Sequence, residues 1–174
     1  MAVDPNGNRR LALGFTEPTF EILSDSTFLC VMRTEDGYGR GPMYLSRSSD
    51  QGATWSQPVA FTPNGVFPGL LQLDNGVLVL VSGRPGVQIR FSLDGKGEKW
   101  TDPFEMIPFS DEIDTAESGK KRIQLIQDIS CGYAELLAIG ADRFLVIYSD
   151  FKYLNKNNEV RKAIKVREIK VSEK

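Results

Sequence analysis

Short runs of apolar and β-branched residues, each ended by a turn, dominate the hydrophobic pattern of the chain. Such runs have the length and composition of strands rather than helices. No stretch shows the period of a long amphipathic helix, and the densely charged stretch 111–122 is expected to be a solvated loop. The fold class is therefore predicted to be all-β, with about a dozen strands. The predicted strands include Phe20–Leu23, Thr27–Arg33, Met43–Ser46, Gly69–Leu73, Val77–Ser82, Val87–Phe91, Ala134–Ile139, Phe144–Tyr148 and Ala163–Val171.

The clearest turn signal is the Asn75-Gly76 step between two of these runs. Both residue types tolerate positive φ, and this dipeptide between apolar runs predicts a tight β-hairpin. Turn residues also separate runs at 24–26 and at 140–142. The chain is therefore expected to fold as a series of hairpins.

A short motif occurs twice, after the first and the second group of runs. Residues 48–55 read S-x-D-x-G-x-T-W, and residues 92–100 repeat this with one extra residue and without the threonine; the two serines are 44 positions apart. The motif suits a tight turn, because Asp binds nearby backbone amides and Gly takes positive φ. Its positions are Ser48, Asp50, Gly52, Thr54, Trp55, Ser92, Asp94 and Trp100.

The repeat predicts three units in the chain, since a third hairpin without the motif follows at 134–148. Units of about 58 residues suit four-stranded propeller blades with loop insertions. The expected blades are 14–62, 63–108 and 122–174, with a charged loop insertion at 109–121.

Charge and composition exclude several classes of function. The 174 residues carry a net charge of −2, with 41% hydrophobic and 25% charged residues, as in a typical folded protein. No nucleic-acid partner is expected without a basic stretch, and no apolar run is long enough to span a bilayer. The chain has no histidine, so any catalysis must use carboxylates, Tyr, Lys, Arg or Cys. No metal or cofactor is predicted.

The cysteines and the N-terminus say little about function. Cys30 lies in an apolar run and is expected to be a buried free thiol, and Cys131 is far from it in sequence. The first ten residues are polar and lack the apolar segment of a signal peptide.

The motif at 48–55 resembles the Asp box of sialidases and related propellers, where it is a structural turn away from the active site. The rest of the chain resembles the C-terminal half of a six-bladed sialidase propeller. It departs from the family pattern in a long insertion at 99–127 and in the residues that flank the tyrosine. The matching segments, in chain order, are 16–23 with Glu17, 28–33 with Arg33, 84–92 with Arg84 and 131–136 with Tyr133.

The resemblance implies an exo-sialidase-type retaining hydrolase that removes terminal sialic acid from glycans. Tyr133 would be the nucleophile and Glu17 its base, while Arg33 and Arg84 would hold the substrate carboxylate. The chemistry is consistent, because a guanidinium grips a carboxylate bidentately and a neutral phenol avoids the repulsion that a carboxylate nucleophile would meet. A phenol with a pKa of about 10 needs a base, and Glu135, on the same strand face as Tyr133, is the alternative to Glu17.

Each assignment has a structural alternative. Arg33 could pair with Glu35 or Asp36, Tyr133 could be a half-buried strand aromatic, and Glu17 could be a plain loop carboxylate. Two other functions also stay open: a non-catalytic propeller that binds glycan or protein, and a propeller enzyme for another acidic sugar such as a uronic acid.

The family's third arginine and its acid/base aspartate lie in N-terminal blades, and no segment here resembles them. The chain is therefore expected to form half of a six-bladed ring with open edges. A missing N-terminal half or a second copy in a homodimer would complete the ring. For the complete protein, the resemblance favours an extracellular or periplasmic location.

Overall fold

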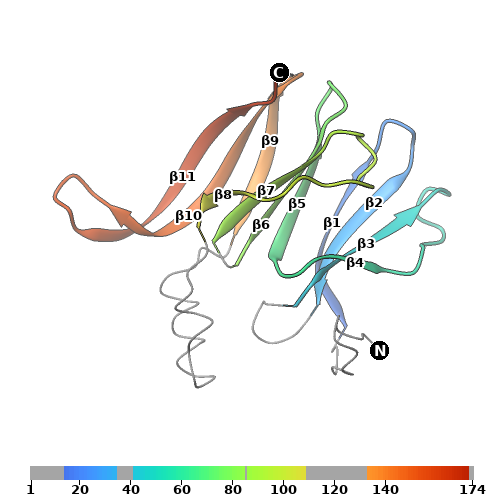
Figure 1. The fold of residues 1–174 in the computed structure, drawn as a ribbon, viewed down its shortest axis with the longest axis horizontal. Coiled ribbons are helices and arrows are strands. Elements are labelled where there is room, and N and C mark those ends of the chain that lie inside the picture. Colours follow the sequence, from blue (N-terminus) through green and yellow to red (C-terminus); the bar gives the residue numbers. More distant parts are fainter. Residues whose placement is uncertain (1–13, 35–40, 85, 109–132, 173–174) are drawn as a thin grey trace.

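The chain is all-β in the computed structural model, which describes residues 14–34, 41–84, 86–108 and 133–172 (Figure 1). These residues form eleven strands in three antiparallel sheets and contain no helix, so none that could cross a membrane. The charged loop expected at 109–121, Cys131 and the acidic pair 35–36 lie outside the described residues.

Each sheet is a simple meander whose strands pair in sequence order. The first two sheets have four strands each, and the third has three within the described residues. Two short strands, β4 and β8, were not anticipated from the sequence, because four residues are too few to show alternation. The first sheet contains β1 (Phe15–Ile22), β2 (Phe28–Thr34), β3 (Met43–Ser48) and β4 (Val59–Thr62); the second contains β5 (Val66–Gln72), β6 (Leu78–Gly83), β7 (Val87–Ser92) and β8 (Phe104–Ile107); the third contains β9 (Ala134–Gly140), β10 (Arg143–Leu154) and β11 (Val160–Lys170).

The hairpin predicted at Asn75-Gly76 is confirmed, with a different loop type. The N–H of Gly76 donates to the carbonyl of Leu73 at 2.8 Å, and the N–H of Leu73 donates to the carbonyl of Val77 at 2.9 Å. Only Gly76 takes positive φ, at 88°. The loop therefore has three residues, a type I turn followed by a glycine bulge, rather than two residues with positive φ.

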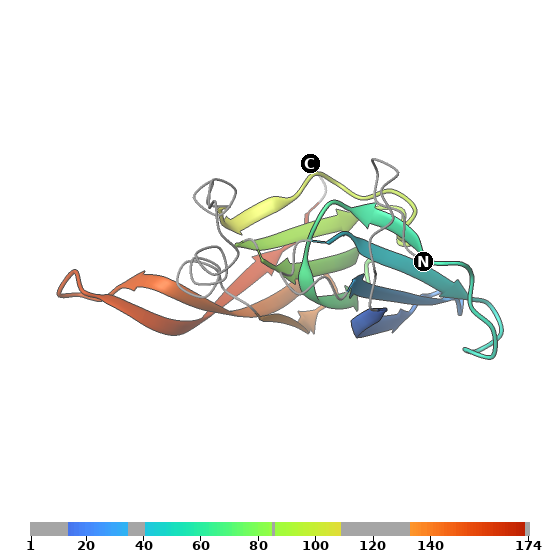
Figure 2. The ribbon, with the colours of Figure 1, turned by 90° about the horizontal axis from the view of Figure 1, so that it is seen from below.

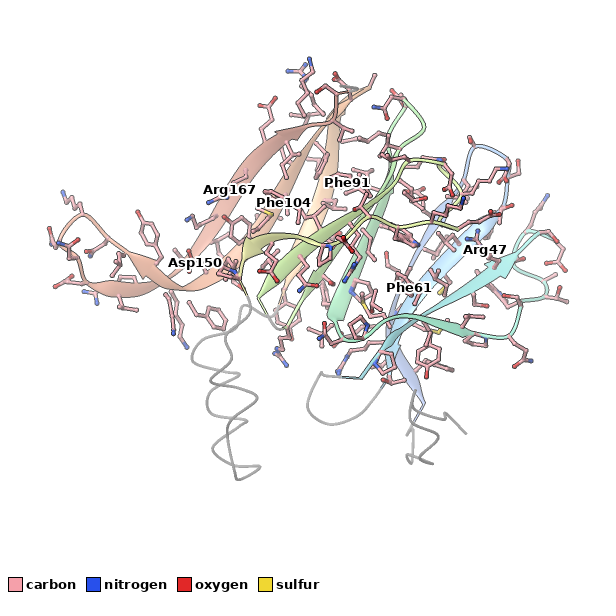
Figure 3. All side chains as sticks on the ribbon, in the orientation of Figure 1. Arg47, Phe61, Phe91, Phe104, Asp150 and Arg167 are labelled. Atoms are coloured by element: carbon pink, nitrogen blue, oxygen red, sulfur yellow. The ribbon has the colours of Figure 1, made fainter. Side chains whose placement is uncertain are left out.

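The three sheets pack face to face in chain order, with their first strands β1, β5 and β9 side by side (Figures 1 and 2). One core lies between the first and second sheets and includes Leu29 and Leu80; the other lies between the second and third and includes Val81 and Val146. Phe91, labelled in Figure 3, packs against Phe144 across the second core with ring centroids 6.4 Å apart. The continuous apolar runs in the middle sheet follow from this, because both of its faces are covered.

The two outer faces of the stack are apolar and uncovered. The outer face of the third sheet, here called the third-sheet face, exposes Leu137, Ile147, Ile164 and Val166 by 44–69%. The strand registers place Ile147 at the position in β10 that Val31 occupies in β2 and Val81 occupies in β6, and both valines are fully buried between sheets. The third sheet therefore keeps the side-chain pattern of a sheet that another sheet covers.

The first sheet shows the same pattern on its own outer face. Phe20 and Ile22 are 60% and 52% exposed there, and the ring of Phe20 stacks on that of Phe28 at 6.2 Å. Cys30 lies on this face, so the prediction that its thiol is buried is wrong: it is half-buried. That partial burial raises the pKa of the Cys30 thiol above its ordinary value.

The two S-x-D motifs fold into matching turns. In the first, Ser48 Oγ donates to Asp50 Oδ1 at 2.7 Å, and Asp50 accepts from the backbone N–H and the hydroxyl of Thr54. These bonds, the side chain of Thr54 foremost, lower the pKa of Asp50 to about 2. Trp55 Nε1 donates to the Gly52 carbonyl at 3.1 Å.

The second turn keeps this network without the threonine. Ser92 and Asp94 hydrogen-bond each other, and the N–H of Lys99 donates to Asp94 Oδ2 at 3.2 Å in the role of the Thr54 N–H. Trp100 Nε1 donates to the Gly97 carbonyl at 3.0 Å. The first turn leaves β3 beside Phe28, and the second leaves β7 beside Leu78. Both therefore lie at the opposite end of their sheets from Arg33, as expected for structural turns.

Candidate functional site

Glu17 and Arg33 form an ion pair at the end of the first sheet where β1 begins and β2 ends. Arg33 Nε lies 2.8 Å from Glu17 Oε2, and the two side chains are 13% and 24% exposed. The pairing of Thr16 with Arg33 across the two strands sets this proximity. Arg33 therefore contacts the carboxylate of Glu17, while the acidic pair 35–36, the alternative partner, lies outside the described residues.

The second sheet contributes a backbone donor to the same carboxylate. The N–H of Phe67 donates to Glu17 Oε2 at 2.7 Å. Phe67 occupies the position in β5 that Glu17 occupies in β1, as their shared register shifts show. One carboxylate oxygen thus joins a guanidinium of the first sheet to the backbone of the second.

The ring of Phe67 contacts Tyr133, which directly precedes β9. The ring centroids are 4.7 Å apart with the planes at 88°, an edge-to-face arrangement. Tyr133 is 56% exposed and lies just before β9 rather than within it. Glu17, Phe67 and Tyr133 therefore form a row across the starts of the three first strands, with Phe67 in the middle.

Three of the six non-glycine residues with positive φ in the described part of the chain lie at this end of the sheets. Glu17, Phe67 and Arg84 have φ of 50°, 48° and 42°, a region that residues with a Cβ rarely adopt. Each such residue costs on the order of 1–2 kcal/mol, and strain of this kind tends to occur at functional sites.

Arg84 lies directly after β6, at the same end of the second sheet as Phe67. Gly83, the last residue of β6, pairs with Val66, and the N–H of Arg84 donates to the carbonyl of Gly86 at 3.1 Å. Arg84 Nε is buried and has no hydrogen-bond partner among the described residues. An unpaired buried guanidinium N–H is costly, so this nitrogen is suited to receive an anion.

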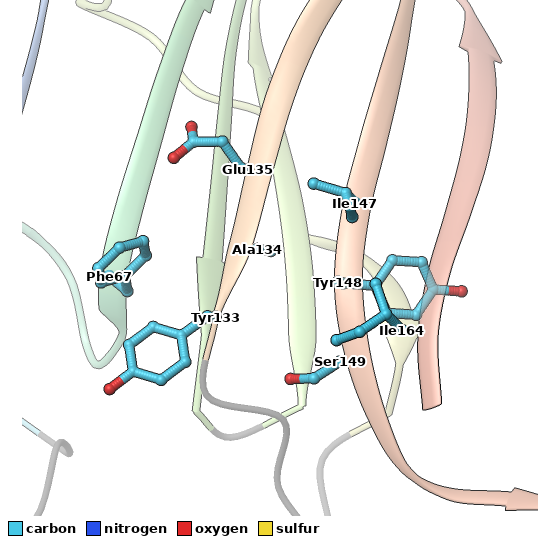
Figure 4. A pocket seen from close by; sticks show the side chains of 8 residues that line it. All are labelled: Phe67, Tyr133, Ala134, Glu135, Ile147, Tyr148, Ser149 and Ile164. Atoms are coloured by element: carbon cyan, nitrogen blue, oxygen red, sulfur yellow. The ribbon is translucent and has the colours of Figure 1, made fainter. Parts of the chain in front are cut away.

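A pocket of about 340 Å³ opens beside Tyr133. It lies at the Tyr133 end of the third-sheet face, where a sheet that covered this face would form its remaining wall, and Figure 4 shows Phe67 on one side of it and the strands β9 and β10 behind it. The hydroxyls of Tyr148 and Ser149 on its wall are buried and lack hydrogen-bond partners among the described residues. Its volume is at the lower end of the range for small-molecule sites. Its lining residues are Phe67, Tyr133, Ala134, Glu135, Ile147, Tyr148, Ser149 and Ile164.

Glu135 shares this pocket with Tyr133, but the two polar groups point different ways in Figure 4. Glu135 Oε1 accepts from the N–H of Leu136 at 3.3 Å and lies close to Gly69, where a Cβ would be 3.0 Å from it. The carboxylate thus packs against β5, away from the phenol oxygen.

The structure brings the predicted residues together in two groups and adds Phe67 as the link between them. Glu17 and Arg33 are in contact, and Tyr133 and Glu135 line one pocket, while Arg84 is not among the residues that line this pocket. The sequence held a signal for Phe67: it precedes Pro68 as Glu17 precedes Pro18. No group of three or more metal-binding side chains occurs in the described part of the chain.

No protein-family model and no curated protein sequence matches the chain. Solved structures do match its fold. A protein of unknown function from Dyadobacter fermentans superposes with a TM-score of 0.64 and 18% identity, over 91% of this chain and 39% of that one. A PL25 ulvan lyase bound to -[GlcA(1-4)Rha3S]- gives a TM-score of 0.58 and 15% identity, over 88% and 38%. The intramolecular trans-sialidase of Ruminococcus gnavus, in complex with oseltamivir carboxylate, gives 0.53 and 17%, over 88% and 32%.

The chain has the fold of part of a β-propeller. Three meander sheets stacked in chain order, with their first strands adjacent, are blades of such a ring. The chain spans between about a third and two-fifths of the length of these solved structures. Sequence identities below 20% support a shared fold but not a shared activity, so the activity must be argued from the residues of the site.

Proposed function

We propose that the protein to which this chain belongs acts on a glycan that carries a carboxylate, as an exo-sialidase-type retaining hydrolase. The observation that carries the proposal is the row of Glu17, Phe67 and Tyr133 at one end of three adjacent blades, with Arg33 bound to Glu17. A carboxylate base, guanidinium groups and an exposed phenol at one end of a propeller are the parts that such a reaction needs. The resemblance of motif order to sialidases supports the same assignment.

Arg33 and Arg84 would hold the substrate carboxylate. The unpaired Nε of Arg84 offers a buried donor, and Arg33 already binds one carboxylate, that of Glu17. Two guanidinium groups from neighbouring blades would fix both the position and the orientation of a sugar acid. The anomeric carbon, one bond from the carboxylate in sialic acid, would then face Tyr133.

Tyr133 would attack the anomeric carbon as Glu17 takes the phenolic proton. The bond from the anomeric carbon to the leaving oxygen breaks, and that oxygen takes a proton from a general acid, the role of the family aspartate that no segment of this chain resembles. Water then attacks the glycosyl-tyrosine, the C–O bond to Tyr133 breaks, and the phenolate takes up a proton, so the configuration is retained. Glu17 is preferred to Glu135 as the base, because Glu135 packs against β5 and its carboxylate points away from the phenol oxygen.

The remaining parts of the site would come from further blades. The third arginine and the acid have no counterpart here, and the uncovered outer faces retain the pattern of covered ones. We propose that those blades come from the rest of a longer protein or from a second copy. Either source would complete a ring around the first strands.

A Tyr133→Phe variant of the complete protein tests the assignment. Turnover of an aryl sialoside should fall by at least about a thousandfold, since the nucleophilic oxygen is gone. The matched control is Tyr44→Phe, which removes a tyrosine hydroxyl from β3, outside the pocket, and should not change turnover. A fluorinated sialosyl donor should add its glycosyl mass to Tyr133 alone. Unchanged turnover in Tyr133→Phe would rule out this mechanism.

An enzyme for uronic acids is the second candidate, because the ulvan lyase structure similar in fold was solved with a glucuronate-containing oligosaccharide. The same arginines would bind a uronate carboxylate. Assays on aryl uronides and on the ultraviolet absorbance of an unsaturated product, run beside the sialoside assay, separate the two. Binding of a free sugar acid without turnover would instead indicate a non-catalytic propeller.

A further inference from the structure

We infer that the hairpin at 150–165, here called the arm, is a second binding surface that holds an anionic polysaccharide running away from the pocket. The inference rests on the proposed function, because it takes an acidic glycan as the substrate class. The arm is formed by the outer parts of β10 and β11 and projects beyond the rest of the chain in both views (Figures 1 and 2). No neighbouring strand covers it on either side within the described residues.

The arm is a built element rather than a loose loop. Its strands pair from Asp150 with Ala163 to Leu154 with Val160, and a register shift between Asp150 and Tyr153 re-aims the outer part. The tip is closed by Asn155, whose side chain accepts from the N–H groups of Asn157 and Glu159 at 2.9 and 3.0 Å. The arm can therefore present side chains in fixed positions.

The arm is positively charged in a chain that is negative overall. It holds five Lys or Arg and two Asp or Glu, for a net charge of +3 in a chain of net charge −2. Both carboxylates are paired inside the arm, Glu159 with Arg161 at 2.7 Å and Asp150 with Lys165 at 3.4 Å. The excess positive charge therefore lies on the exposed Lys152, Lys156 and Lys162, where it attracts a polyanion.

Two aromatic rings of the arm each lie under an ammonium group. Lys162 Nζ is 5.0 Å from the centre of the Phe151 ring, and Lys165 Nζ is 5.3 Å from that of Tyr153. The open face of such a ring can pack against the C–H face of a sugar ring, while the ammonium of Lys162, which no carboxylate of the arm pairs with, can bind a carboxylate or sulfate on that sugar. This combination favours an acidic polysaccharide over a neutral one.

The arm continues from the wall of the pocket beside Tyr133. At the base of the arm, Ile164 pairs with Ser149 and both residues line the pocket, and the next pair outward is Asp150 with Ala163. Asp150 is labelled in Figure 3 where the arm leaves the sheet. At about 3.3 Å per residue, the strand from Ser149 to Leu154 extends roughly 16 Å from the pocket. This continuity argues for a glycan chain rather than nucleic acid, which basic and aromatic side chains also bind.

The experiment compares two charge-reversal double variants of the complete protein. Lys152→Glu with Lys156→Glu changes the arm, and Lys96→Glu with Lys99→Glu makes the same charge change at exposed positions of the second S-x-D turn. Binding of α2,8-linked polysialic acid, polygalacturonate, neutral dextran and duplex DNA is measured at low and high salt. The arm variant should bind both acidic polymers about tenfold more weakly at low salt, and the control variant should bind them as wild type does.

A second readout separates this inference from the proposed function. In the arm variant, the ratio of polymer turnover to aryl-glycoside turnover should fall. If the proposed function is wrong, the wild-type protein will not turn over the aryl glycoside at all. Equal polymer binding by wild type and the arm variant, or equal binding of dextran and the acidic polymers, would overturn the inference. Tighter binding of DNA than of either acidic polymer would also overturn it.

Discussion

The uncovered third-sheet face gives the sharpest stability prediction. Ile147 is 44% exposed there, whereas its counterparts Val31 and Val81 in the other two sheets are fully buried. Burying the exposed remainder of Leu137, Ile147, Ile164 and Val166 under another sheet would stabilise the assembly by roughly 3–7 kcal/mol. In self-association the partner chain buries a similar area, so the contact contributes roughly 6–14 kcal/mol, from which at least about 4 kcal/mol is lost to the cost of association. We therefore expect the 174-residue chain, made alone, to self-associate at about 10–100 µM.

Ile147→Lys tests this expectation. The substitution removes an apolar side chain from the contact and would bury an ammonium, at a cost of at least about 3 kcal/mol, so association should weaken more than a hundredfold. Sedimentation velocity over a range of concentrations measures it. The matched control is Val59→Lys, which places the same charge on a 64%-exposed position of the edge strand β4.

Two results would contradict the expectation that another sheet covers the third-sheet face. A wild-type chain that sediments as a single monomer at every concentration, with the same thermal midpoint as Ile147→Lys, would mean that this face is stable without a partner. Self-association that Val59→Lys weakens as much as Ile147→Lys does would place the contact on the sheet edge instead.

Two further predictions concern the S-x-D turns. Gly97→Ala should destabilise the chain by about 2–4 kcal/mol in denaturant unfolding, because Gly97 has φ of 66° and an added Cβ would lie 2.8 Å from Leu29 Cδ2. The control Gly76→Ala also has positive φ but open space around the new Cβ, so it should cost only about 1 kcal/mol. Equal losses of stability in the two variants would refute the packing argument. Asp50→Asn should lower the thermal midpoint near neutral pH, and the difference from wild type should shrink as the pH falls from about 4 to about 2. The reason is that the pKa of Asp50 is lower in the folded chain than its unfolded value of 3.8, so its ionised carboxylate stabilises the fold above that value and loses this effect as it is protonated. Asp74→Asn, at an exposed turn position, is the control, and a pH-independent difference would show that the charge of Asp50 contributes nothing.

The sequence predicted the class of fold because each blade repeats a local pattern. Alternating apolar runs, turn residues and the S-x-D motif are all short-range signals, and the sheets and turns follow them. The type of the Asn75-Gly76 loop could not be read from the sequence, because loop length depends on the register of the flanking strands. The half-exposure of Cys30 could not be read either, since an apolar run does not show whether another sheet covers it.

The candidate site shows the same division between local and long-range information. A motif order could nominate Glu17, Arg33, Arg84 and Tyr133, but the bond from the N–H of Phe67 to Glu17 joins residues 50 positions apart in the sequence. Such contacts depend on how the blades pack, which no local pattern records. Their roles in catalysis stay predictions for the variants above to test.

Phe67 connects the fold to the proposed chemistry. The repeat places it between Glu17 and Tyr133, and its strained backbone directs an N–H to the carboxylate while its ring packs edge-on against the phenol. If Glu17 is the base for Tyr133, proton transfer must pass beside this residue, whose apolar ring limits the access of water. A polar side chain there would hydrate both groups, so the position should tolerate Leu or Tyr better than Asn. The middle blade would thus contribute to the site by excluding water, without a catalytic group at that position.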